Sequence, residues 1–307
     1  MSDLRQSLND YLGLRHEFGY QLKNSGELLF KFVDFCDDAN AHVVTIELAL
    51  AWATLPTNCS RVWGACRLRA VRGFARYLHA LDPRTEVPPT RLLPDGPHRV
   101  TPYLYSSDQV RALMEAARTL ASPLRAATSE TIIGLLATSG LRVGEALRLD
   151  RDDVDLIEGV VTIHLTKFHK TRRVPLHPTG LEAMSAYATR RDELMPRASS
   201  PAFFVSVSGV RLSYGSFRTT FHDLVGQVGL EVRSPARPTI HGLRHTFATN
   251  VLTRWHEEGV DMPTLLPSLS TYLGHVDPAS TYWYLSGSSA LLQSALARLE
   301  ATYEVTS

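Results

Sequence analysis

A proline-rich segment divides the chain into two parts that cannot share one continuous array of helices. Between residues 83 and 102 the prolines and one glycine are Pro83, Pro88, Pro89, Pro94, Gly96, Pro97 and Pro102. Proline lacks a backbone N–H and fixes φ, so this density ends helices and favours extended chain. We expect two domains, residues 1–82 and 103–307, joined by a linker over residues 83–102. The second domain is expected to end in a C-terminal helix over residues 289–301.

The N-terminal part has the apolar spacing of helices. Leu28, Phe32 and Phe35 follow one another at steps of four and three residues. A second stripe predicts a helix that begins near Ser60 and whose core-facing residues are Trp63, Cys66, Ala70, Phe74 and Tyr77. Three cationic residues form another stripe along the same helix: Arg69, Arg72 and Arg76.

The C-terminal part combines helices with one β-hairpin. Helical patterns begin at Ser107 and cover about 129–149, 178–195 and 214–228, then resume at 241. Two strand-like runs, 160–165 and 173–176, flank a basic turn. The fold is therefore predicted to be mainly α, with a small β-sheet or hairpin in the second domain.

Composition excludes several classes of protein. No stretch approaches the roughly 18 apolar residues of a membrane span, and we expect no secretory signal because no apolar segment follows Met1. Cys36, Cys59 and Cys66 form no CxxC pair, which argues against zinc fingers and disulfide scaffolds and favours a reducing cytoplasm. The sequence has no GxxxxGK[ST] loop for ATP. We expect no cofactor and no metal.

The overall charge balance hides two local basic surfaces. The chain has 32 Lys and Arg residues against 31 Asp and Glu residues, whereas nucleic-acid-binding domains usually show a basic excess. Residues 61–76 nevertheless hold five arginines and no acid, and residues 167–173 hold four cations and no acid. Each segment is a candidate for contact with phosphate groups, and a solvated surface is the alternative in each case.

The basic turn contains two of the four lysines in the chain, Lys167 and Lys170. A lysine can give up a proton, whereas an arginine effectively cannot. In a chain that otherwise uses arginine, this choice indicates a role in proton transfer.

An arginine is embedded in the apolar segment TSGLRVGEALRL, which begins at Thr138. Arg142 and Glu145 are three residues apart, so their side chains can pair on one face of a helix. The pair is either a structural ion pair or a device that holds Arg142 so that its guanidinium points into a site.

A second arginine lies in the segment HGLRHTFAT, where His241 and Arg244 share a helical face. His241 and His245 also have the spacing of two zinc ligands in HExxH enzymes. That interpretation requires a glutamate where Gly242 stands, and Arg244 would repel a cation.

The order of these segments resembles that of the tyrosine recombinases, the phage integrase family. The resemblance covers residues 105 to about 290 and depends on four motifs, namely TSGLRVGEALRL, KFHKTRRVPL, HGLRHTFAT and LGHVDPASTYWY. Each motif alone is weak, but together, in this order and spacing, they are highly specific. The resemblance implies a helical N-terminal core-binding domain and a mixed α+β catalytic domain.

The resemblance also implies which residues form the site. Arg142 and Arg244 match the two catalytic arginines, with Glu145 as the acidic neighbour of the first. The remaining matches are His241 of the HxxR pair, Lys167 of the hairpin, His275 of LGH and Tyr284 as the nucleophile, with Tyr282 as a near rival. The residues expected to contact DNA are Arg69, Arg72, Arg76, Lys170, Arg172 and Arg173.

These residue types suit DNA strand exchange. Arg142, Arg244 and His275 can donate to the non-bridging oxygens of a phosphodiester, where negative charge gathers during attack. Tyrosine has an ordinary pKa of about 10, so Tyr284 needs a base, for which His241 is the candidate. Lys167 can protonate the leaving 5′-oxygen. A covalent 3′-phosphotyrosine keeps the bond energy, so resealing requires no ATP.

The expected partner is double-stranded DNA with specific recombination sites. We expect a homotetramer to bind this DNA, with other recombinases as further partners. The expected location is the cytoplasm, at the nucleoid. The sequence resembles transposon-borne members more than chromosome-resolving ones. The alternatives are a type IB topoisomerase, a DNA-binding protein with a decayed site, and a metallohydrolase that uses His241 and His245.

Overall fold

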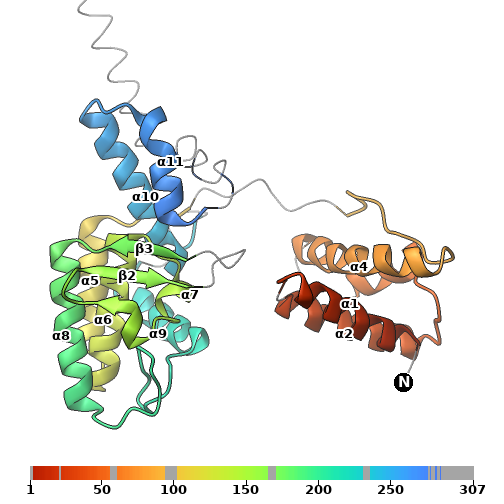
Figure 1. Cartoon of the computed structure of the whole chain (residues 1–307), viewed down its shortest axis with the longest axis horizontal. Coiled ribbons are helices and arrows are strands. Elements are labelled where there is room, and N and C mark those ends of the chain that lie inside the picture. The colour runs from red at the N-terminus through yellow and green to blue at the C-terminus, as the bar shows by residue number, and fades with distance from the viewer. Residues whose placement is uncertain are drawn as a thin grey trace, which may run out of the picture. The chain divides into compact units, whose positions relative to one another are not determined.

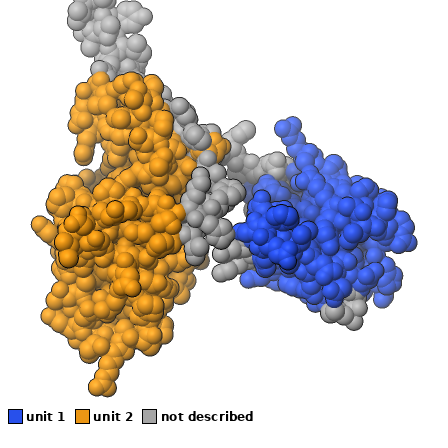
Figure 2. All heavy atoms as spheres, viewed as in Figure 1, with its two compact units in different colours: residues 1–100 blue, residues 101–307 orange. Residues whose placement is uncertain are grey.

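The computed structural model describes residues 3–20, 22–55, 61–93, 102–164, 171–230 and 236–275, together with Asp277, Thr281 and Tyr284. The chain forms two compact units, residues 1–100 and 101–307 (Figure 2). The predicted fold class is confirmed, because helices dominate the described residues and the strands among them form one small sheet (Figure 1).

The described residues of the first unit form four helices around one hydrophobic core: α1 (Asp3–Glu17), α2 (Lys23–Asp38), α3 (Ile46–Thr54) and α4 (Arg61–Leu81). Helix α4 contacts each of the other three. Its buried side chains repeat at helical spacing and include Leu68, Val71, Phe74, Ala75 and Leu78. This face is displaced from the predicted stripe, so that Phe74 belongs to both but Trp63 is exposed.

The first half of the expected linker packs against the first unit. Within residues 83–93 the side chain of Thr85 is buried. Arg72 of α4 donates through Nε to the carbonyl oxygen of Pro88 at 2.7 Å and through Nη2 to that of Pro89 at 2.8 Å. The linker prediction therefore placed the end of the first domain too early, because proline prevents helix formation without preventing tertiary packing.

The second unit is built around α6 (Pro123–Ser139), which has buried residues around most of its circumference. Helices α5, α8 and α10 pack against it. The other helices of this unit are α5 (Ser107–Arg118), α7 (Val143–Ala146), the 3₁₀ turn η1 (Arg151–Asp153), α8 (Pro178–Leu194), α9 (Tyr214–Gln227), α10 (Ile240–Glu257) and α11 (Met262–Leu273). Side-chain hydrogen bonds cap the N-termini of several of these helices. The hydroxyl of Ser106, for example, caps α5.

The antiparallel sheet has the order β1 (Val154–Asp155), β2 (Val160–Ile163), β3 (Arg172–Pro175). The predicted hairpin is confirmed in β2 and β3, where Val161 lies opposite Val174 and both side chains are buried. Strand β1 was not predicted, since two residues are too few to show an alternating pattern. Lys167 and Lys170 fall outside the described residues.

Helices α10 and α11 lie side by side (Figure 1) and share a small apolar cluster. Its buried members are Ala248, Leu252, Leu266, Leu269, Leu273 and Tyr284. This packing brings the end of α11 to the start of α10. None of the helices in the described part of the chain combines the length and apolarity needed to cross a bilayer.

Candidate active site

The first arginine is delivered by the turn that ends α6. Gly140 caps the helix with φ of 62°, and a Cβ there would lie 2.4 Å from Cδ1 of Phe247. Only glycine suits a position that needs both this backbone conformation and this close approach. The chain then continues through the buried Leu141 to Arg142, which has extended backbone angles and begins α7.

Glu145 holds Arg142 at both its backbone and its side chain. Oε2 of Glu145 accepts from the backbone N–H of Arg142 at 2.9 Å, and Oε1 accepts from Nη1 at 2.9 Å. The side chain of Arg142 is 38% exposed, whereas that of Glu145 is 4% exposed. The predicted pair therefore exists, and a buried carboxylate fixes an arginine that solvent can reach.

The second arginine, Arg244, lies in the first turns of α10 and is only 1% exposed. Its Nη1 donates to the carbonyl oxygen of Gly140 and its Nη2 to that of Leu273, both at 2.8 Å. Burial, followed by the nearby charge of Arg142, lowers the pKa of Arg244 to about 10. The guanidinium is therefore still charged at neutral pH.

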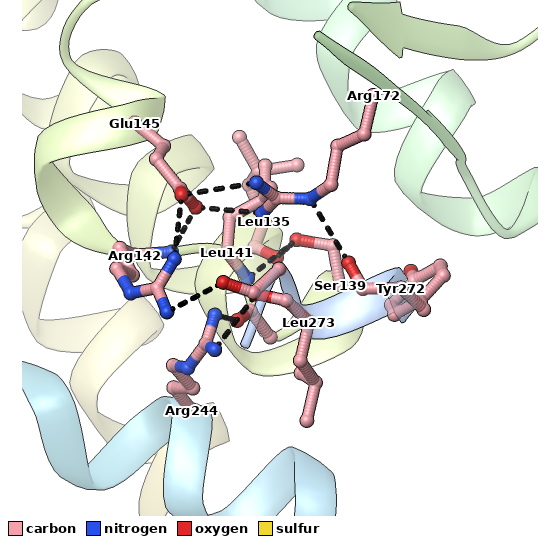
Figure 3. A network of polar contacts seen from close by, with 11 residues as sticks. Leu135, Ser139, Leu141, Arg142, Glu145, Arg172, Arg244, Tyr272 and Leu273 are labelled. Carbon is pink, nitrogen blue, oxygen red and sulfur yellow. Dashed lines mark hydrogen bonds and ion pairs between the residues drawn. The ribbon is translucent and has the colours of Figure 1, made fainter. Parts of the chain in front are cut away.

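Three arginines from three elements converge on the end of α11 (Figure 3). The successive carbonyl oxygens of residues 272, 273 and 274 accept from Arg172, Arg244 and Arg142 at 3.0, 2.8 and 2.9 Å. The last carbonyl groups of a helix have no partner within the helix and carry partial negative charge. The arginines therefore cap α11 and fix where the chain leaves it.

His275 and Tyr284 follow this capped end. Nδ1 of His275 lies 2.7 Å from the hydroxyl oxygen of Thr281. The ring of Tyr284 stacks on that of His275, with centroids 6.2 Å apart, and lies 5.4 Å from the ring of His245. His245 in turn contacts His241 edge to face at 4.5 Å. Tyr284 is 3% exposed, so its phenol ring is enclosed by the site and the apolar cluster.

Desolvation and the nearby arginines lower the pKa values of the two site histidines. Burial, then Arg244 and Arg142, lowers the pKa of His275 to about 4. Desolvation by the surrounding protein, followed by the same two arginines, lowers the pKa of His241. At neutral pH His275 is a neutral hydrogen-bond donor, and His241 is a neutral imidazole that can accept a proton.

We expect His275 to titrate near pH 4 in the DNA-free protein. Its ordinary pKa is about 6.5, so the folded state binds fewer protons than the unfolded state between these values. This contribution to stability is therefore present above pH 6.5 and is lost as pH falls toward 4. Histidine-detected NMR measures the pKa, and thermal unfolding of the protein and of His275→Gln measures the linkage. A titration near 6.5 would contradict the described environment.

The structure brings together five of the six predicted catalytic residues: Arg142, His241, Arg244, His275 and Tyr284. The sixth, Lys167, and the rival nucleophile Tyr282 fall outside the described residues. Arg172 requires a correction, because its side chain is 12% exposed and bonded to Glu145 rather than projecting from the hairpin. Its neighbour Arg173 is exposed on β3.

The arginine stripe of α4 borders a surface pocket of about 340 Å³ in the first unit. The pocket is lined by Arg69, Arg72, Gly73, Arg76, Thr90 and Arg91. Arg91 was not among the predicted residues, because it lies in the proline-rich segment that was expected to be a linker. Arg72 also fastens that segment to α4, so it has a structural role beside any contact with DNA.

The described residues contain no group of three or more His, Cys, Asp or Glu side chains that could hold a metal ion. In α10, Arg244 follows His241 by three residues and directly precedes His245, so it places a fixed positive charge beside them.

Comparison with known proteins gives a consistent assignment. The phage integrase family model matches residues 104–289. The putative integrase/recombinase y4rB of Sinorhizobium fredii is 43% identical, and the alignment covers 99% of each chain. The tyrosine recombinase XerC of Mycobacterium sp. (strain JLS) is 31% identical over 92% of this chain and 94% of its own.

Solved structures share the fold. The Tn1549 transposon integrase in complex with transposon right-end DNA has a TM-score of 0.68 at 18% identity and covers 98% of this chain and 99% of its own. The XerA recombinase has a TM-score of 0.53 at 24% identity, with coverage of 96% and 98%. With the family model and the full-length relatives, these observations show that the chain belongs to the phage integrase family of tyrosine recombinases, enzymes that break and rejoin DNA.

Proposed function

We propose that this protein is a site-specific recombinase that cleaves DNA through Tyr284 and reseals it with a new partner strand. The observation that carries the proposal is the convergence of Arg142, Arg244, His275 and Tyr284 at the capped end of α11. It supplies fixed donors for a phosphate beside a phenol that can attack the phosphate.

In the proposed reaction, Oη of Tyr284 attacks the phosphorus and the bond to the 5′-oxygen breaks. Arg142, Arg244 and His275 donate to the non-bridging oxygens, which become more negative during attack. The neutral imidazole of His241 accepts the phenol proton. The product is a 3′-phosphotyrosine, and attack on it by a 5′-hydroxyl of another strand restores Tyr284.

We propose Lys167 as the acid that protonates the leaving 5′-oxygen. Lys167→Ala should slow cleavage of an ordinary phosphodiester by about 100-fold or more. A substrate with a bridging 5′-sulfur should restore most of the rate, because a thiolate leaves without a proton. Cleavage kinetics on the two substrates measure this rescue. Rescue of Lys170→Ala instead would assign the role to the other lysine.

The first unit is proposed to bind the DNA backbone through the pocket of Arg69, Arg72, Arg76 and Arg91. Arginine donates two parallel hydrogen bonds to a phosphate, and such contacts give affinity without reading sequence. Arg173, exposed on β3, and Lys170 are proposed as further contacts in the second unit. The Tn1549 transposon integrase in complex with transposon right end DNA, among the structural relatives, supports this part of the proposal.

A role in a mobile element is supported by the transposon integrase among the structural neighbours and by the y4rB relative named as an integrase/recombinase. We propose that the protein acts on synapsed DNA as a homotetramer, alone or with other recombinases, at the nucleoid in the cytoplasm.

A plasmid with two copies of the DNA that flanks the gene tests the proposal. We expect deletion or inversion between the copies, without ATP and unchanged in EDTA. Relaxation without exchange would favour a topoisomerase, binding without any covalent adduct would favour a DNA-binding protein, and loss of activity in EDTA would favour a metallohydrolase.

A further inference from the structure

Arg172 makes contacts that the proposed chemistry does not use. It is the first residue of β3 and follows Lys167 by five residues in the sequence. Its Nη1 and Nη2 donate to Oε1 and Oε2 of Glu145 at 3.1 and 2.8 Å, and its Nε donates to the carbonyl oxygen of Tyr272 at 3.0 Å. Each nitrogen of this guanidinium therefore donates to another element of the fold (Figure 3).

Through Glu145, Arg172 reaches the exposed arginine of the site. The same carboxylate accepts from the backbone N–H and the Nη1 of Arg142. A carboxylate that is only 4% exposed needs its charge balanced, because water cannot solvate it. Without Arg172, Glu145 would keep one partner and would be free to rotate or take up a proton. Arg142 would then be held firmly only by its bond to the carbonyl oxygen of Gly274 and would be less well oriented.

Through the carbonyl oxygen of Tyr272, Arg172 also holds the end of α11. That helix has no basic residue in its own last turn, so its described cationic caps come from β3, α7 and α10. Gly274 makes this possible, since a Cβ there would lie 2.5 Å from Nη1 of Arg172 and the residue has φ of 70°. The guanidinium thus lies against the chain that leads to His275.

We propose that Arg172 is a positioning residue for strand cleavage, holding Arg142 through Glu145 and the His275–Tyr284 segment through the end of α11. The inference rests on the proposed recombinase function. It assigns Arg172 to the interior of the site rather than to DNA contact. It also means that one side chain of β3 contacts both Glu145 and the end of α11.

Two variants separate charge from geometry. Arg172→Met keeps an unbranched apolar stem and removes the charge, whereas Arg172→Lys keeps the charge but cannot bridge both oxygens of Glu145 and the carbonyl of Tyr272. Arg118→Met is the matched control, because Arg118 forms an exposed ion pair with Glu130 in the same unit. The substrate is a nicked duplex of the DNA flanking the gene, which traps the covalent adduct.

We expect both Arg172 variants to slow single-turnover adduct formation by about 100-fold, as displacement of a phosphate ligand by an ångström can do. The Kd for the duplex, measured by fluorescence anisotropy, should stay within about threefold, because DNA contact is not the role of Arg172. Arg118→Met should match the unaltered protein in both measurements. Thermal unfolding identifies a variant that fails to fold. If Arg172→Met fails to fold, the adduct formation of Arg172→Lys, the milder change, tests the inference.

A double variant tests the route through Glu145. In a Glu145→Gln background, Arg172→Met should slow cleavage much less than it does alone, because the contact between Arg172 and residue 145 is already weakened. Multiplicative effects, or an unimpaired Arg172→Met protein, would overturn the inference while leaving the proposed function intact. No adduct with any protein, including the unaltered one, would contradict the proposed function and the inference with it.

Discussion

We expect Tyr284→Phe to abolish the covalent protein–DNA adduct on a nicked substrate, a loss of at least about 10⁴-fold in cleavage. The substitution removes only the attacking oxygen. The phenyl ring still fills its place in the apolar cluster between α10 and α11. The free energy of unfolding should therefore change by no more than about 1 kcal/mol. Gel electrophoresis under denaturing conditions measures the adduct, and urea unfolding measures the stability.

Tyr282→Phe is the matched variant for this experiment. It removes a phenol oxygen two residues earlier in the same segment and should leave adduct formation intact. An adduct that survives Tyr284→Phe and disappears with Tyr282→Phe would reverse the assignment of the nucleophile.

Arg244→Lys should reduce both activity and stability. A lysine cannot reach Gly140 and Leu273 at once, so one buried carbonyl oxygen loses its donor at a cost of about 1–3 kcal/mol. Loss of a guanidinium that is placed to stabilise charge on the phosphate should lower the cleavage rate about 100- to 1000-fold. Single-turnover kinetics and urea unfolding measure the two effects.

Arg254→Lys provides the control for Arg244→Lys. Arg254 is exposed in the last turn of the same helix, α10, so its replacement should leave both cleavage and stability nearly unchanged. Equal losses in the two variants would show that the effect comes from the helix rather than from the site.

The sequence predicted most of the fold because its signals are local. Apolar spacing indicated the helices, and the β-branched run at 160–165 indicated the hairpin, which the structure places at β2 and β3. Proline density marked the end of the helical region correctly but did not reveal that residues 83–93 remain packed on it. Tertiary contacts such as those between Arg72 and the two proline carbonyls leave no trace in a local pattern.

In the site, too, local sequence signals predicted some features and tertiary contacts determined others. The motifs predicted Arg142, Glu145, Arg244, His275 and Tyr284, which the structure brings to one place. They predicted that Arg172 contacts DNA, although strand alternation places Arg172 on the same face as the buried Val174. Alternation could therefore have indicated an inward arginine. The three arginine bonds to the end of α11 could not be foreseen, since they depend on how four elements meet in space.

The most direct test of the account is to locate the phosphate bond on the chain. After cleavage of the nicked duplex, digestion with nuclease and trypsin yields the peptide of residues 255–298, which contains Tyr272, Tyr282 and Tyr284. Tandem mass spectrometry should find a nucleotide joined through its 3′-phosphate to Tyr284. A nucleotide on another residue, or cleavage that leaves every tyrosine of this peptide unmodified, would contradict the account.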